Sequence, residues 1–176
     1  TILLVASVLW VSLDPLKMAS GVFRNGRLFS ADGIQILFHR DGKTASVDLY
    51  KTGRYTIIST NGKPDAGLSE NEPSKDEPTM VLMAMLPYAT HLRATKVANI
   101  GIGSGLTSQM LLTIPAIKQV DTIEIEPAMV EGAKGFGERV AKTFTDPRSH
   151  IYIEDAKTFF TNHQQIYDLI ISEPSN

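Results

Sequence analysis

Three glycines at alternate positions and a later glutamate are the residues of this sequence whose spacing best suits a chemical task. Gly101, Gly103 and Gly105 follow a short apolar run, and Glu124 falls near the end of the next one, Val120–Ile125. Glycine permits a positive φ angle and a close approach of the backbone to a ligand. The first N–H groups of a helix are free to face that ligand, and a glutamate can accept hydrogen bonds from both hydroxyls of a ribose. The pattern predicts a nucleoside site.

The spacing of the glycines separates two kinds of nucleoside ligand. The dinucleotide fingerprint G-x-G-x-x-G requires glycine at position 106, where this sequence has Leu106. The pattern G-x-G-x-G suits nucleosides of the S-adenosylmethionine type better, because they bring no pyrophosphate for the loop to hold. The alternative interpretation is a tight strand-to-helix turn in a sheet protein that binds nothing.

The elements that must position these residues alternate between strands and helices in the second half of the chain. Apolar runs predict strands at Val97–Ile100, Val120–Ile125, His150–Glu154 and Tyr167–Ser172. Helices are predicted at Leu106–Ile114, which Pro115 ends, at about Ala128–Lys142, which Pro127 begins, and at Ala156–Asn162. This alternation predicts an α/β fold with a parallel, doubly wound sheet.

Three of the predicted strands end in acids that should meet at one edge of this sheet. These acids are Glu124, Asp155 and Glu173. Ligands bind at the carboxyl ends of the strands in this architecture. Each acid alone is better explained as a helix cap or a solvated strand end, but three of them beside a glycine turn indicate a binding edge.

Turn signals in the first half of the chain predict a small antiparallel β-module. Its predicted strands are Ile34–Arg40, Thr44–Lys51 and Arg54–Thr60, with turns at Asp41-Gly42 and Asn61-Gly62. Residues 21–33 are predicted to be loop, as is the polar stretch 64–78, which is rich in proline and acids. A helix limited by Pro87 is predicted at Thr79–His91.

The first thirteen residues, Thr1–Leu13, are nearly all apolar and carry no charge. They fall short of the ~20 residues that span a bilayer, so we expect the end of a longer transmembrane helix. The basic residues that follow, Lys17, Arg24 and Arg27, place this domain on the cytoplasmic side of the inner membrane. A signal-peptide core and a buried strand or helix are the alternatives, and the protein would then be soluble in the cytoplasm.

The composition excludes several classes of function. The 176 residues are 43% hydrophobic and 20% charged, and 17 basic against 19 acidic residues give no sign of nucleic-acid binding. The sequence has no Cys, which excludes disulfides, thiolate metal sites and a Cys nucleophile. Its four histidines have no metal-ligand spacing, so no metal is expected. Because the sequence lacks an initial Met and stops directly after a predicted strand, we expect a fragment of a longer protein.

Six motifs together resemble the spermidine synthase (polyamine aminopropyltransferase) family, in particular bacterial membrane proteins in which such a domain follows transmembrane helices. They are DPLKMASGVFR at 14–24, NGKPDA at 61–66, NIGIGSG at 99–105, EIEPAMVE at 124–131, EDA at 154–156 and YDLIISEPSN at 167–176. The resemblance implies a small β-domain packed on a Rossmann-like domain of the class I methyltransferase type, truncated at its C-terminus. The expected division is 1–20 for the membrane end and linker, 21–78 for the β-domain and loop, and 79–176 for the nucleoside-binding domain.

The resemblance also implies roles for individual residues by their position in the motifs. The turn that binds the nucleoside of the donor would be formed by Gly101, Gly103, Ser104 and Gly105. Glu124 would hold the ribose of that nucleoside, and Asp155 and Ala156 would face its adenine. Glu173 would be the catalytic proton acceptor. The implied reaction transfers an aminopropyl group from decarboxylated S-adenosylmethionine to an amine acceptor in polyamine biosynthesis. A homodimer is one assembly to be expected.

Departures from the family pattern keep other functions open. Ser104 replaces an Asp that holds donor and acceptor amines, Glu173 replaces a shorter Asp, and Asn176 replaces an acid. The apolar residues 80–82 stand where the family has polar ones. Methyl transfer from S-adenosylmethionine tolerates such losses because it needs mainly positioning. A non-catalytic nucleoside-binding sensor domain of a membrane protein is the other alternative.

Overall fold

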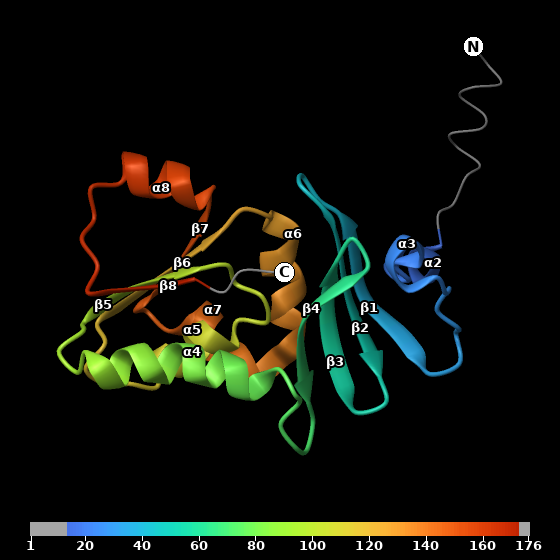
Figure 1. The fold of residues 1–176 in the computed structure, drawn as a ribbon, viewed down its shortest axis with the longest axis horizontal. Helices are drawn as coiled ribbons and strands as arrows, with labels where there is room; N and C mark the ends of the chain where they lie inside the picture. The colour runs from blue at the N-terminus through green and yellow to red at the C-terminus, as the bar shows by residue number, and fades with distance from the viewer. Residues whose placement is uncertain (1–13, 173–176) are drawn as a thin grey trace, which may run out of the picture.

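The computed structural model describes residues 14–172 as two sheets joined by helices (Figure 1). The strands are β1 (Ile34–Asp41), β2 (Ser46–Thr52), β3 (Tyr55–Thr60), β4 (Lys63–Ser69), β5 (Lys96–Ile100), β6 (Gln119–Glu124), β7 (Ser149–Ile153) and β8 (Leu169–Ser172). The helices are α2 (Pro15–Ala19), α3 (Val22–Asn25), α4 (Glu77–Thr90), α5 (Leu106–Leu111), α6 (Pro127–Ala133), the 3₁₀ helix η1 (Lys134–Val140), α7 (Ala141–Thr145) and α8 (Ala156–Asn162). Figure 1 shows α6 between the two sheets.

The second half of the chain folds into the predicted parallel sheet. Its strand order is β7-β6-β5-β8, and each neighbouring pair runs parallel. Strands are added on one side of β5 and then on the other, and in such sheets the crevice at the carboxyl ends of the strands is the usual ligand site. The parallel sheet, preceded by a separate antiparallel sheet, confirms the predicted α/β fold class.

The antiparallel sheet has four strands in the order β1-β2-β3-β4, one more than predicted. The prediction of loop over 64–78 was wrong for its first part, because β4 pairs with β3. Pro64 and the neighbouring acid hid this strand. Proline is tolerated there because β4 lies at the edge of the sheet, where a missing N–H breaks no ladder on the outer side. The loop prediction for 21–33 also missed the one-turn helix α3.

The single helix predicted at Ala128–Lys142 is three shorter segments, α6, η1 and α7. The break is at Gly137, whose φ of 63° and ψ of −137° are not helical. Only glycine adopts this combination without strain, so the chain can turn there. In contrast, α4 continues through Pro87, which had been expected to limit it, and ends at Thr90.

One hydrophobic cluster connects the two sheets. Its buried members come from the antiparallel sheet (Val47, Leu49, Ile58, Ala66, Leu68), from α4, the turn after β5 and the start of α5 (Met80, Ile102, Leu106), and from α6 and η1 (Ala128, Met129, Ala133, Phe136, Val140). The antiparallel sheet therefore packs on helices and a turn of the parallel half, and the partly buried Ile151 of β7 packs against the same cluster. The predicted domain boundary at residue 78 stays a prediction.

Two predictions concern residues outside the described range. The apolar run Thr1–Leu13 and the acid Glu173 both lie beyond residues 14–172, so their predicted roles stay predictions. Within that range, no helix combines the length and the apolar character needed to cross a bilayer.

Candidate functional site

The three glycines after β5 form a turn that needs glycine at each position. Gly101, Gly103 and Gly105 have φ angles of 86°, 50° and 86°, in the left-handed region that side chains disfavour. The Gly101 N–H donates to the Ile123 carbonyl at 2.8 Å. This bond continues the contact of the chain with β6 as it leaves the sheet, and the turn therefore lies at the carboxyl edge of the strands.

Glu124 ends β6 beside this turn, and its carboxylate is held by two backbone N–H groups. Its Oε2 accepts from Ile102 at 3.0 Å and its Oε1 accepts from Glu126 at 2.9 Å. The residue is only 9% exposed. Since each carboxylate oxygen can accept more than one hydrogen bond, this fixed group still has acceptor capacity for a ligand.

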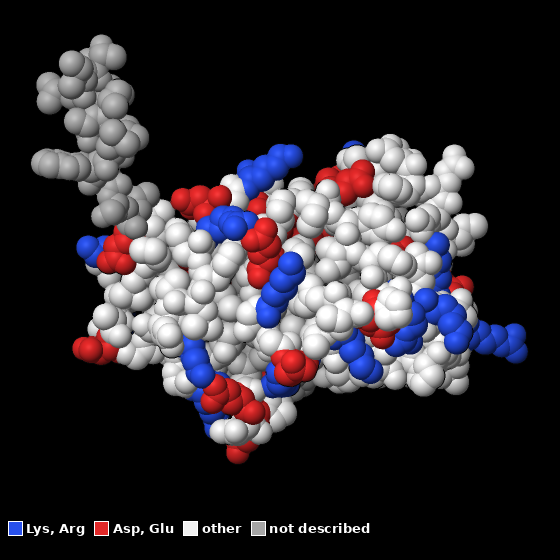
Figure 2. All heavy atoms as spheres, turned by 180° about the vertical axis from the view of Figure 1, so that it is seen from behind, with Lys and Arg blue, Asp and Glu red and all other residues white. Residues whose placement is uncertain are grey.

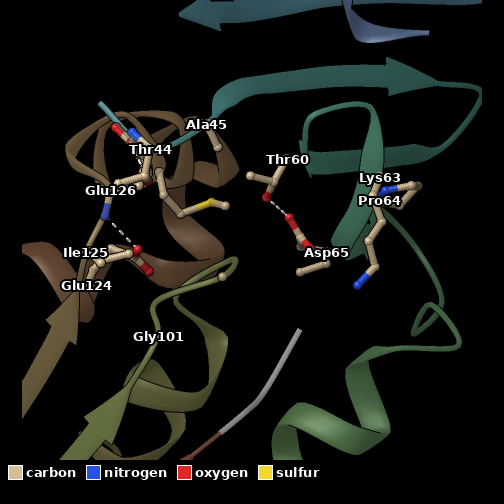
Figure 3. A pocket seen from close by; sticks show the side chains of 13 residues that line it. Thr44, Ala45, Thr60, Lys63, Pro64, Asp65, Gly101, Glu124, Ile125 and Glu126 are labelled. Carbon is tan, nitrogen blue, oxygen red and sulfur yellow. Dashed lines mark hydrogen bonds between the residues drawn. The ribbon is translucent and has the colours of Figure 1, made fainter. Parts of the chain in front are cut away.

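A cavity of about 410 Å³ opens between the glycine turn and the antiparallel sheet. Its walls are formed by Thr44, Ala45, Thr60, Lys63, Pro64, Asp65 and Ala66 on one side and by Gly101, Gly103, Glu124, Ile125, Glu126 and Met129 on the other. Figure 3 shows Glu124 and Asp65 on opposite sides of this space. Its volume is in the range of small-molecule sites.

Ser104 belongs to the glycine turn, but its side chain does not line the cavity. It is fully buried, and its hydroxyl lies 3.1 Å from the sulfur of Met80 on α4. The Leu106 N–H donates to the same hydroxyl at 3.3 Å. The side chain therefore points into the core beneath the turn.

Glu126 has a role that sequence reasoning did not find. Its carboxylate accepts from the Ala128 N–H at 3.0 Å, and also from the N–H and hydroxyl of Thr44 at 2.6 and 2.7 Å. Burial alone would raise its pKa, but these hydrogen bonds outweigh burial and lower the pKa to about 2. Glu126 thus ties the β1–β2 loop to the start of α6 as an ionised group.

Asp155 and Ala156 lie away from this cavity. The Asp155 carboxylate caps α8 by accepting from the N–H and hydroxyl of Thr158 at 2.9 and 3.1 Å. These hydrogen bonds lower the pKa of Asp155 below its usual value. Ala156, the first residue of α8, packs against the cluster of Ala98, Ile123 and Phe159. The structure thus brings the glycine turn and Glu124 to one cavity but does not bring these two residues to it.

Sequence reasoning also missed the polar residues that the β3–β4 hairpin contributes to the cavity. These are Thr60, Lys63 and Asp65. The Asn61-Gly62 turn is a signal for a following strand. The prolines and acids that come after it favour a loop instead, and they conceal this second wall of the cavity in the sequence.

A buried polar network supports the glycine turn from below. The amide of Asn99 donates to the Gly101 carbonyl at 3.1 Å and to the Ser108 hydroxyl at 3.0 Å. The Ser108 hydroxyl lies 2.8 Å from that of Thr122 on the neighbouring strand. These bonds connect the end of β5 with the first turn of α5 and with β6. They hold the glycine turn in place relative to Glu124.

Comparisons with known proteins agree with this architecture. Residues 79–176 match the family described as the spermine/spermidine synthase domain. The polyamine aminopropyltransferase of Alkaliphilus oremlandii is 33% identical over 95 residues, which cover 54% of this chain and 34% of that protein. The putrescine N-methyltransferase 2 of Nicotiana attenuata is 28% identical over 152 residues, covering 86% of this chain and 40% of that protein.

Two solved structures share the fold. The spermidine synthase of Thermotoga maritima has a TM-score of 0.70 at 18% identity, covering 81% of this chain and 47% of that one. A spermidine synthase in complex with the transition-state analogue AdoDATO has a TM-score of 0.69 at 18% identity, covering 79% and 47%. The present chain spans between about a third and a half of the length of these relatives.

Proposed function

The chain belongs to the spermine/spermidine synthase domain family, and on this basis we propose that its protein is an aminopropyltransferase of polyamine biosynthesis. The donor would be decarboxylated S-adenosylmethionine and the acceptor an amine. The observation that carries this proposal is the fixed carboxylate of Glu124, which lines one cavity together with the glycine turn. Relatives named polyamine aminopropyltransferase support the choice of reaction.

The donor site is proposed to be built mainly from the carboxyl edge of the parallel sheet. Gly101, Gly103 and Gly105 would let the nucleoside approach the backbone, with Ser104 contributing as part of the turn. Glu124 would accept from the ribose hydroxyls, since its carboxylate is already oriented by two N–H groups. Asp155 and Ala156 would lie toward the adenine by the family resemblance, beyond the cavity described here.

The proposed reaction is a displacement at the methylene carbon beside the sulfonium. A neutral acceptor amine forms the new C–N bond, the C–S bond breaks, and methylthioadenosine leaves with the bonding electrons. The acceptor's pKa in water is ~10, so a carboxylate is needed to take its proton. Glu173, which the resemblance assigns to this step, is proposed as that base.

Binding of methylthioadenosine to a Glu124→Ala variant tests the nucleoside site. We expect an affinity loss of about 1.5–3 kcal/mol, the range for a hydrogen bond to a charged group, measured by calorimetry on the full protein. Glu131→Ala, which removes an exposed acid on α6 outside the cavity, should bind as the wild type does. Thermal unfolding of both variants checks that they are folded. Unchanged affinity in Glu124→Ala would reject the assignment.

Methyl transfer from S-adenosylmethionine is the second candidate, and the cationic side chain in the cavity favours it. Lys63 lines the wall beside Asp65, and it could pair with the carboxylate that S-adenosylmethionine carries and its decarboxylated form lacks. The relatives named putrescine N-methyltransferase cover 86% of this chain. Product analysis with each donor separates the candidates. Absence of turnover with both donors would favour the sensor alternative.

We also propose that the apolar run Thr1–Leu13 attaches the protein to the inner membrane, with this domain in the cytoplasm. The exposed cations that follow it, Lys17, Arg24 and Arg27, agree with the positive-inside rule. Fractionation of cells that express the full protein tests this proposal. Recovery in the membrane fraction is expected, and recovery in the soluble fraction would reject attachment.

A further inference from the structure

The glycine turn faces a strand of the other sheet at close range. A Cβ built on Gly103 would lie 3.9 Å from the Cβ of Ala66 on β4, which is van der Waals distance. Asp65 immediately precedes Ala66 and lines the same cavity. The wall that β4 provides therefore lies directly opposite the turn that is proposed to hold the donor.

Asp65 is the extra residue of a β-bulge. Ile58 of β3 pairs with Ala66, but the next residue, Ser59, pairs with Pro64, so the register of the ladder passes over Asp65. Bulges occur often beside active sites, where they redirect a side chain. The Asp65 carboxylate accepts a hydrogen bond from the hydroxyl of Thr60, which also lines the cavity (Figure 3).

The turn before β4 sets this bulge in place. Asn61 and Gly62 both have positive φ angles, 49° and 72°, as in the tight two-residue turns that join antiparallel strands. Pro64 then restricts the backbone next to Asp65. The position of the carboxylate thus follows from the hairpin itself rather than from a flexible loop.

The carboxylates that line the cavity have different tasks. That of Glu126 already binds Thr44 and Ala128, and that of Glu124 is assigned to the ribose. The turn itself adds no acid, because its residues 101–105 read GIGSG and the Ser104 side chain is buried. The Asp65 carboxylate lines the opposite wall of the cavity, where it accepts from the Thr60 hydroxyl. Since a carboxylate oxygen can accept more than one hydrogen bond, an ammonium group at hydrogen-bond distance can bind it as well.

We propose that Asp65 binds a primary ammonium group of a substrate, so that β4 supplies the anion that the glycine turn lacks. This inference rests on the proposed function. The ammonium could belong to the aminopropyl end of the donor or to the acceptor amine. Both sources offer the same chemistry to Asp65, and binding measurements with separate probes distinguish them.

Calorimetry on the full protein with the Asp65→Asn variant tests the proposal. The probes are methylthioadenosine, which has no ammonium group, decarboxylated S-adenosylmethionine, and putrescine added to protein saturated with methylthioadenosine. Methylthioadenosine should bind within twofold of wild type. Decarboxylated S-adenosylmethionine should bind about 10- to 100-fold more weakly if Asp65 holds the donor, and putrescine should do so if it holds the acceptor.

Two further variants separate binding from folding. Asp41→Asn is a matched control, because Asp41 lies in the same sheet and also accepts from a hydroxyl, that of Ser46, but does not line the cavity. It should leave all three affinities unchanged. Thr60→Val should give a smaller loss than Asp65→Asn with the same probe, because it removes the group that orients the carboxylate.

The outcomes distinguish this inference from the proposed function. Wild-type affinities for all three probes in Asp65→Asn would overturn the role of Asp65 alone. An equal loss for methylthioadenosine would also overturn it, because Asp65 would then be structural. A wild-type protein that binds no methylthioadenosine would overturn the proposed nucleoside site and this inference with it.

Discussion

Glu124 and Glu126 are two positions apart, yet their carboxylates serve different parts of the molecule. Glu124 lines the cavity beside the glycine turn, while Glu126 reaches the loop of the other sheet at Thr44. The reason is that Glu124 ends a strand and Glu126 precedes the first turn of α6, where its side chain also accepts from Ala128. One acid is available to a ligand and the other holds the two sheets together.

Replacing Glu126 by Gln should destabilise the protein by about 1–3 kcal/mol, because the Thr44 and Ala128 donors lose an ionised acceptor. The folded-state pKa of about 2 lies below the usual 4.5. The contribution of Glu126 is therefore present above pH 4.5 and is lost as the pH falls through about 2. Urea unfolding between pH 7 and pH 2 should show that Glu126→Gln loses less stability than the wild type as the pH falls.

Glu131→Gln is the control for this experiment. Glu131 pairs with Arg40 at the surface, and such exposed pairs contribute about 0–1 kcal/mol. The two variants should therefore differ clearly at neutral pH. Equal stability of Glu126→Gln and wild type at pH 7 would contradict the role assigned to Glu126.

Replacing Glu173 by Gln should separate binding from catalysis. Glutamine keeps the size of the side chain but cannot take the proton of the acceptor amine. We expect methylthioadenosine affinity close to wild type and a group-transfer rate that falls by ~10²–10⁴, the usual contribution of a general base. Single-turnover rates together with calorimetry measure both. Full transfer activity in the variant would exclude Glu173 as the base and favour methyl transfer.

At the scale of elements, the break at Gly137 directs α7 onto the glycine turn. A Cβ built on Gly105 would lie 3.4 Å from the Thr143 side chain and 3.6 Å from that of Val140. The Thr143 hydroxyl also donates to the Gly105 carbonyl at 2.8 Å. A continuous helix from α6 could not turn to make these contacts. The break at Gly137 is therefore what allows the chain after Pro127 to pack against the glycine turn.

Substitution of Gly137 by Ala should cost more stability than the same change at Gly26. Both glycines have φ near 64° and open space around the Cβ position, but ψ is −137° at Gly137 and 11° at Gly26. Alanine in the left-handed helical conformation of Gly26 should lose about 1 kcal/mol of stability. Alanine in the conformation of Gly137, which is not helical, should lose about 2–3 kcal/mol. Urea unfolding measures both. Equal losses would mean that ψ at Gly137 is not constrained.

At the scale of the whole molecule, the shared core makes the two sheets depend on each other. Ile58 of β3 is fully buried in this core, and a Cβ built on Gly132 of α6 would lie 3.1 Å from its Cδ1. The antiparallel sheet thus packs directly on the helix that follows β6. The cavity lies along the same boundary, so its shape requires both sheets to be folded.

Substitution of Ile58 by Ala should destabilise both sheets together by about 2–5 kcal/mol, the range for a large buried aliphatic side chain. Hydrogen exchange should show the same loss of protection in β3 and in β5. Leu37→Ala, at a half-exposed position of β1, should cost less than about 1 kcal/mol. Loss of protection confined to the antiparallel sheet would show that the two sheets unfold independently.

Much of the parallel sheet could be predicted, since each strand is an apolar run next to a recognisable helix or turn. The helix Ala156–Asn162 was predicted with its observed bounds, and Asp155 before it supplies the cap. The predictions failed where local signals conflict with packing. Pro64 argued against a strand that the edge of a sheet tolerates, and the sequence after Pro127 looked continuous although Gly137 breaks it.

The strand, glycine turn, helix and acid around Gly101–Glu124 can be read from the residue types, because each of these steps depends on residues that are close along the chain. Which side chains meet there depends instead on the packing of distant segments. Ser104 turns inward because Met80 of α4 packs beneath it. Glu126 reaches Thr44 across 82 positions of sequence, and Asp65 enters the cavity because a bulge redirects it. Such contacts arise from the packing of two sheets, and no local pattern of residue types encodes them.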